Sequence, residues 1–103
     1  MNIRFYSYGN IIRILAQDSD ASADAVMVDV CLDNKQILSL FDGAKQFDAD
    51  FIRSYLNILR ESKVSFRLLS NPPEDQTLRA QAIDILRLNA SEQPIIKKLI
   101  ARI

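Results

Sequence analysis

The chain has 103 residues, of which 49% are apolar and 25% are charged, a composition typical of one globular domain over residues 1–103. Two glycines and three prolines exclude a low-complexity chain. No apolar run approaches the about 20 residues that span a bilayer, so we expect no membrane insertion. The net charge is zero, yet residues 1–51 carry four basic and eight acidic side chains, and residues 52–103 carry nine and five. This asymmetry either steers a charged partner or vanishes when the two halves interleave in space.

The start of the chain has neither a long apolar segment nor a small-residue cleavage site, so it does not resemble a signal peptide. Cys31 is the only cysteine, which excludes an intrachain disulfide and favours a reducing cytoplasm. Because Cys31 lies in an apolar run, and the chain has no histidine to activate it, we interpret it as an inert core residue.

Alternating side chains over residues 2–8 predict a strand, and the apolar run 11–15 predicts a second one. Gly9 and Asn10 separate the two runs, which is typical of a β-hairpin. Residues 25–33 are ambiguous, because their apolar spacing fits both a strand and a helical face. The three valines in this segment favour the strand.

Residues 37–41 form a short apolar run bounded by turn signals, which predicts a buried strand. An amphipathic helix is expected over 48–62, followed by a strand over 64–69, so these three elements predict a parallel βαβ unit. One helix should start within the segment 70–75, and the last helix should begin near Ser91 or Gln93 with Pro94 in its first turn, where a proline costs no hydrogen bond. The sequence therefore predicts an α/β domain with a mixed sheet of four to five strands, an N-terminal β-hairpin, one parallel βαβ unit and two C-terminal helices.

The sequence lacks most of the groups that catalysis uses. Without histidine, neither a Ser-His-Asp nor a Cys-His arrangement can form, and a single cysteine cannot complete a zinc site. Gly9 and Gly43 are isolated, so no phosphate-binding loop exists. We therefore expect no enzymatic activity and no cofactor.

Asp18, Asp20 and Asp24 invite a test for calcium, since closely spaced carboxylates can bind it. An EF-hand loop needs glycine at its sixth position and glutamate at its twelfth, where this chain has Ala23 and Asp29. Solvated loop and capping residues are the favoured interpretation, and no metal is expected.

Basic residues cluster near the end of the chain, at Lys97, Lys98 and Arg102, with Arg79 and Arg87 on the preceding helix. A chain without net charge binds phosphate backbones weakly, and no nucleic-acid-binding signature is present. The cluster therefore predicts a solvated helix face and no nucleic-acid partner.

The layout from residue 2 to about residue 88 resembles a STAS domain, the fold of anti-anti-sigma factors. The resemblance is carried by the hairpin turn Tyr8-Gly9-Asn10-Ile11-Ile12, the segment 20–25, the strand and acidic turn over 37–43, the helix start over 47–51 and the segment 64–70. It implies a non-catalytic regulator that binds another protein.

In STAS domains a serine or threonine at this helix start is phosphorylated to switch partner binding. Ala49 and Asp50 stand at the corresponding places here, and neither accepts a phosphate as serine does. The resemblance places the partner contact at five residues: Asp42, Asp48, Asp50, Arg53 and Asn57.

Three other interpretations stay open. The first is a bacterial immunity protein or antitoxin that masks a basic toxin with an acidic surface made of Asp18, Asp20, Asp24, Asp29 and Asp33. The second is a homo-oligomer formed through the apolar stripe of the last helix, at Ile95, Ile96, Leu99, Ile100 and Ile103. The third is an unrecognised enzyme using the carboxylates of Asp42, Asp48 and Asp50, for which capping and turn formation are the simpler explanation.

Overall fold

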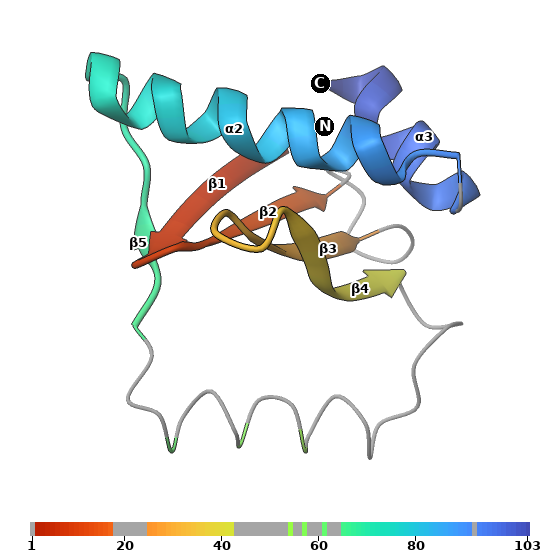
Figure 1. Cartoon of the computed structure of the whole chain (residues 1–103), viewed down its shortest axis with the longest axis horizontal. Helices are drawn as coiled ribbons and strands as arrows, with labels where there is room; N and C mark the ends of the chain where they lie inside the picture. Colours follow the sequence, from red (N-terminus) through yellow and green to blue (C-terminus); the bar gives the residue numbers. More distant parts are fainter. Residues whose placement is uncertain are drawn as a thin grey trace.

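The computed structural model describes residues 2–17, 25–42, 54, 57, 61, 65–91 and 93–103. Its strands are β1 (Asn2–Tyr8), β2 (Ile11–Gln17), β3 (Val26–Cys31), β4 (Gln36–Asp42) and β5 (Arg67–Leu68), and its helices are α2 (Pro73–Asn89) and α3 (Pro94–Arg102). The strands form one sheet in the order β4-β3-β2-β1-β5, and α2 and α3 lie together on one of its faces (Figure 1).

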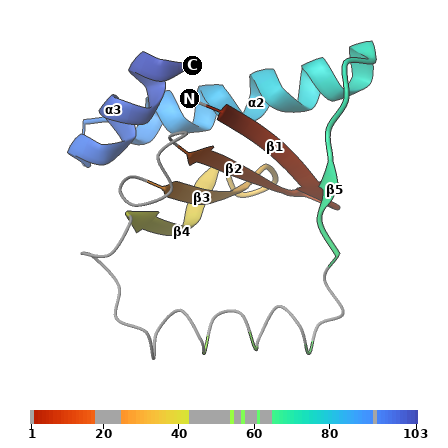
Figure 2. The same ribbon diagram turned by 180° about the vertical axis from the view of Figure 1, so that it is seen from behind.

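The predicted hairpin is confirmed, and so is the choice of a strand for the ambiguous segment. Gly9 and Asn10 form the two-residue loop between β1 and β2, since Tyr8 pairs with Ile11. Gly9 has φ +53°, a left-handed conformation that costs glycine little and other residues more. Strands β1 to β4 thus follow one another as a meander, each antiparallel to the one before (Figure 2).

The predicted parallel βαβ unit is wrong, and so is the mixed sheet that it implied. Strands β4 and β5 lie at opposite edges of the sheet with three strands between them, and every strand pair that the described residues form is antiparallel. The physical reason is that the meander leaves only two open edges, and β5 pairs with β1, where Leu68 lies opposite Tyr6. The Leu69 N–H also donates to the Phe5 carbonyl at 2.8 Å, which extends this contact.

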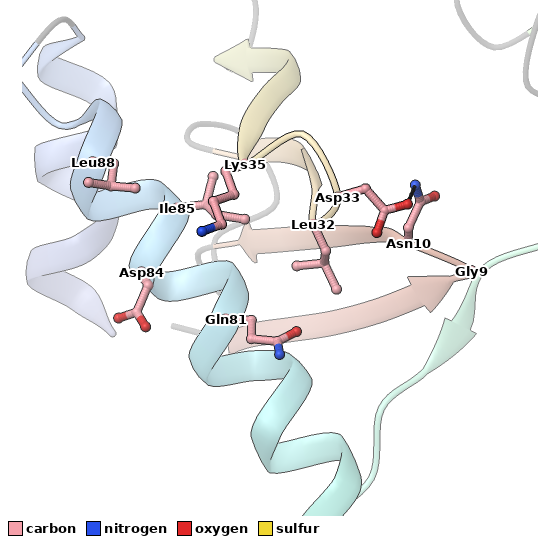
Figure 3. A pocket seen from close by; sticks show the side chains of 9 residues that line it. All are labelled: Gly9, Asn10, Leu32, Asp33, Lys35, Gln81, Asp84, Ile85 and Leu88. Carbon is pink, nitrogen blue, oxygen red and sulfur yellow. Dashed lines mark hydrogen bonds between the residues drawn. The ribbon is translucent and has the colours of Figure 1, made fainter.

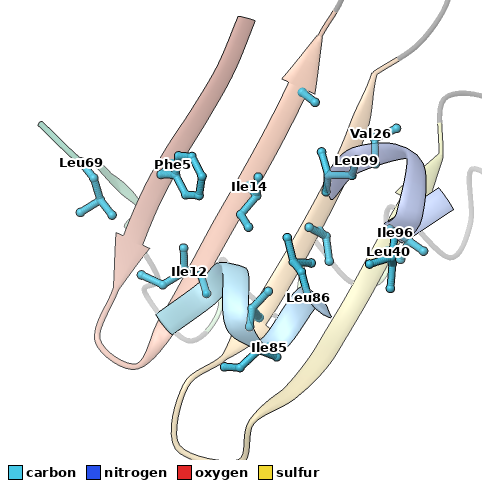
Figure 4. Packing of buried hydrophobic residues seen from close by; sticks show 14 residues of the cluster. Phe5, Ile12, Ile14, Val26, Leu40, Leu69, Ile85, Leu86, Ile96 and Leu99 are labelled. Atoms are coloured by element: carbon cyan, nitrogen blue, oxygen red, sulfur yellow. The ribbon is translucent and has the colours of Figure 1, made fainter. Parts of the chain in front are cut away.

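One face of the sheet packs against the helices. In register across β1 to β4, Phe5, Ile14, Val28 and Leu40 form a buried apolar row, and similar rows lie on either side of it. Helices α2 and α3 cover these rows with buried apolar side chains that include Ile85, Leu86, Ile96 and Leu99 (Figure 4). Burying one such aliphatic side chain completely contributes about 1.5–3 kcal/mol to the free energy of unfolding, so the packing on this face is the main source of stability among the described residues.

Helix α3 uses its apolar stripe within this core. Ile96 and Leu99 are almost completely buried, and Ile95 and Ile100 pack against the same cluster. Ile103 is the member of the stripe that stays substantially exposed. No helix in the described ranges has the length and apolar character needed to cross a membrane.

Candidate functional site

Two hairpin turns lie next to each other at one end of the sheet. The Leu32 N–H donates to the Asn10 carbonyl at 2.7 Å, which ties the β3–β4 turn to the β1–β2 turn. The Asn10 amide nitrogen donates to the Asp33 carboxylate at 2.6 Å and lies 3.7 Å from the sulfur of buried Cys31. One amide group carries two N–H donors, so Asn10 can hold both contacts at once and fix the two turns against each other.

The β3–β4 turn contains a strained residue. Lys35 has φ +49°, which is uncommon for a residue with a side chain because its Cβ crowds the following carbonyl. Glycine or asparagine usually occupies such a position. Here the position is taken by a lysine, whose side chain is exposed directly before the first residue of β4.

One face of α2 lies over the two turns. Gln81, Asp84, Ile85 and Leu88 follow the i, i+3, i+4, i+7 spacing that places side chains on the same side of a helix. Ile85 reaches the core, whereas Leu88 has 70% of its surface exposed. A leucine this exposed gains little from folding, and its position beside the pocket makes it available to a partner.

The turns and this face of α2 enclose a pocket of about 620 Å³, within the range of sites that hold a drug-sized molecule or a short peptide segment. Figure 3 shows Leu32 and Ile85 between the turn and the helix, with Asn10 and Asp33 facing each other beside them. The pocket therefore has an aliphatic floor and a polar rim, the arrangement found at many protein interfaces. Its lining residues are Gly9, Asn10, Leu32, Asp33, Lys35, Gln81, Asp84, Ile85 and Leu88.

Three charged side chains line the pocket. Asp33 accepts a hydrogen bond from the neutral Asn10 amide and forms no ion pair within the described residues. Asp84 lies 3.8 Å from Arg87, which is one helical turn away and largely exposed. Lys35 takes part in no ion pair with any other described residue. The rim thus carries two carboxylates and one ammonium, and the charge of Asp33 is the least compensated of the carboxylates.

The opposite face of the sheet contains a buried ion pair. Arg13 and Asp29 are cross-strand neighbours, and the guanidinium contacts both carboxylate oxygens, at 2.8 Å from Nε and 2.9 Å from Nη2. The Asp29 side chain is fully buried, and the Phe66 ring lies 4.0 Å from the guanidinium carbon. Tyr8 packs against Phe66 with the ring centres 6.1 Å apart. The two-oxygen contact joins paired positions of β2 and β3, which assigns it a role in strand register.

A second polar cluster fixes the entry to α2. The Asp75 carboxylate accepts from the Ser70 N–H at 2.9 Å and from its hydroxyl at 3.0 Å, and Arg67 lies 3.6 Å away. Burial acts to raise the pKa of Asp75, but the Ser70 hydrogen bonds and the Arg67 charge outweigh it and lower the pKa below its usual range. Arg79 donates to the Leu69 carbonyl at 2.6 Å and thereby holds the same loop.

The described part of the chain contains two of the five residues predicted for a STAS-type contact. Asp42 ends β4, and Asn57 is exposed and helical. Asp48, Asp50 and Arg53 lie outside the described residues.

The described residues include two of the five aspartates of the predicted acidic surface. Asp29 is fully buried against Arg13 and is therefore not part of a surface. Asp33 is exposed and lines the pocket. Asp18, Asp20 and Asp24 lie outside the described residues.

Comparisons with known proteins add no relative: no protein-family model matches the chain, and no curated protein or solved structure shows significant similarity to it. The resemblance to STAS domains therefore stays a prediction. The pocket and its exposed leucine rest on the geometry of this chain alone.

Proposed function

We propose that this protein is a non-catalytic regulator that acts by binding a partner protein, and that the partner docks on the turn surface, defined as the β1–β2 turn, the β3–β4 turn and the face of α2 that contains Leu88. The observation that carries the proposal is the 70% exposure of Leu88 at the rim of a pocket with an aliphatic floor. Exposed apolar surface beside a concave, partly apolar site marks a candidate binding surface.

The strain at Lys35 gives independent support. A residue held in an unfavourable backbone conformation often marks a functional segment, because the surrounding structure must stabilise it. Here the surrounding structure is the bonded pair of turns, with Asn10 contacting both Leu32 and Asp33. A rigid, bonded surface loses little conformational entropy on binding, which favours affinity.

The test is affinity capture from the native cell lysate with the parent chain and three variants. Leu88→Glu should lose the partner, because a charge replaces the apolar centre of the contact. Leu68→Glu is the matched control, since Leu68 is also exposed, at 55%, but lies on β5 opposite Tyr6 and is not among the residues that line the pocket. Asn57→Lys tests the surface that the STAS resemblance implies.

The expected result is a protein captured by the parent, Leu68→Glu and Asn57→Lys chains and absent with Leu88→Glu. Because Leu88 makes little contact with the core, the folded state of Leu88→Glu should be unchanged by circular dichroism. If Leu88→Glu captures the partner as well as the parent does, the turn surface is not the docking site. If Asn57→Lys alone loses the partner, the contact lies where the STAS resemblance places it.

A further inference from the structure

We infer that the pocket on the turn surface receives an arginine side chain of the partner, with the guanidinium on Asp33 and its aliphatic stem on Leu32 and Ile85. This inference rests on the proposed function and names the chemistry of the occupant. It combines three features of one site: the concavity, the aliphatic floor and an exposed carboxylate without a cationic partner among the described residues.

The carboxylate of Asp33 decides the sign of the occupant. Two carboxylates and one ammonium line the pocket, and Arg87 lies beside one of the carboxylates, so the preference for a cation comes from the local charge of Asp33. Asp33 is the better anchor, because its known partner is the neutral Asn10 amide and its side chain is exposed. Asp84 already has Arg87 at 3.8 Å, so part of its charge is compensated.

The shape of the site decides between arginine and lysine. Leu32 and Ile85 lie between the turn and α2, where an aliphatic stem can pack before its head reaches the Asp33 side of the rim (Figure 3). Asn10 donates to one oxygen of Asp33, at 2.6 Å, and because each carboxylate oxygen can accept more than one hydrogen bond, the planar guanidinium fork can still donate to both oxygens. The ammonium of lysine is a more strongly hydrated point charge and gains less from this geometry.

The experiment is an NMR titration of the ¹⁵N-labelled full chain with three capped tripeptides. The probe is acetyl-Leu-Arg-Leu-amide. The matched peptides replace arginine by citrulline, which has almost the same shape without the charge, or by glutamate. A peptide this small is expected to bind weakly, so the titration extends to about 10 mM, which reaches Kd values of about 1 mM.

The arginine peptide should shift the amide signals of Leu32, Asp33, Ile85 and Leu88, and its apparent Kd should be at least about tenfold lower than that of the citrulline peptide. Asp33→Asn should weaken binding of the arginine peptide by about tenfold. Asp84→Asn should weaken it by less than about threefold, because Arg87 already compensates that carboxylate.

Equal affinity for the arginine, citrulline and glutamate peptides, shifts confined to other surfaces, or no shift at about 10 mM would each overturn the arginine assignment. These outcomes are distinct from failure of the proposed function, which is decided by Leu88→Glu in the capture experiment. A partner lost with Leu88→Glu but retained with Asp33→Asn would keep the docking surface and remove the arginine.

Discussion

Removing the Asp29 carboxylate should strongly destabilise the fold. Asp29 is fully buried and Arg13 has only 16% of its side chain exposed, so Asp29→Ala leaves a guanidinium in a largely dry site without the carboxylate that it contacts through two hydrogen bonds. Breaking a buried pair from one side costs about 3–5 kcal/mol. The remaining exposure of Arg13 places the expected loss near the lower limit, at about 3 kcal/mol.

The measurement is equilibrium urea unfolding of the parent, Asp29→Ala and the double variant Arg13→Met with Asp29→Leu. The double variant removes both charges, so it should recover most of the loss, because well-packed apolar replacements of buried pairs are often neutral. Total stabilities of small domains are about 5–15 kcal/mol, so a loss of 3 kcal/mol gives a clear shift of the midpoint.

A loss below about 1 kcal/mol for Asp29→Ala would show that the pair behaves as a solvated surface contact. If both Asp29→Ala and the double variant are strongly destabilised, the packing around Asp29 contributes more to the free energy of unfolding than its charge does. Either result would contradict the stabilising role assigned to the Arg13–Asp29 pair on the sheet face opposite the helices.

Three further variants test other parts of the fold. Because folding lowers the pKa of Asp75, its ionised carboxylate adds to the free energy of unfolding fully above the unfolded pKa of about 3.9, and this stabilisation is lost as the pH falls through the folded pKa. The urea midpoints of the parent and Asp75→Asn should therefore differ by a constant amount above about pH 5 and converge as the pH falls below about 4. Lys35→Gly should keep or slightly raise the melting temperature, whereas Lys35→Val should lower the free energy of unfolding by about 1–2 kcal/mol, because only glycine adopts φ +49° without strain. Leu99→Ala should cost about 2–5 kcal/mol while Ile103→Ala costs less than about 0.5 kcal/mol; equal losses would mean that α3 is not part of the core as described.

Local signals in the sequence predicted most of the elements that the structure describes, whereas most of the helix expected over 48–62 lies outside the described residues. The pair Gly9-Asn10 specifies a two-residue hairpin through its own backbone preferences, so the turn needs no information from distant residues. The valines of β3 lie at alternate positions, so a strand buries all of them on the sheet face that α2 and α3 cover. The prolines at the start of α2 and α3 mark helix starts for an equally local reason.

Pairing between elements was harder to predict, because it depends on which sheet edges remain open. A strand, a helix and another strand in sequence often make a parallel unit, but here β1 offered the edge that β5 joined. The Arg13–Asp29 ion pair could be predicted only after the register of β2 and β3 is known, because the register places these opposite charges next to each other.

The candidate site could not be predicted from sequence because three distant segments build it. Residues 9–10, residues 32–35 and one face of α2 carry no shared motif. The available signal was Leu88, an apolar residue outside the helical stripe that contains Leu78, Ala82, Ile85 and Leu86. Such a residue is either an isolated surface leucine or part of an interface, and only its position beside the pocket favours the second.

The most direct test of the account is the affinity of the captured partner for purified chains, measured by isothermal titration calorimetry. Leu88→Glu should raise the Kd at least about 30-fold relative to the parent, the loss of about 2 kcal/mol expected at the centre of an interface, with the free energy of unfolding unchanged. Leu68→Glu should bind as the parent does. A Kd for Leu88→Glu within about twofold of the parent value would contradict docking on the turn surface.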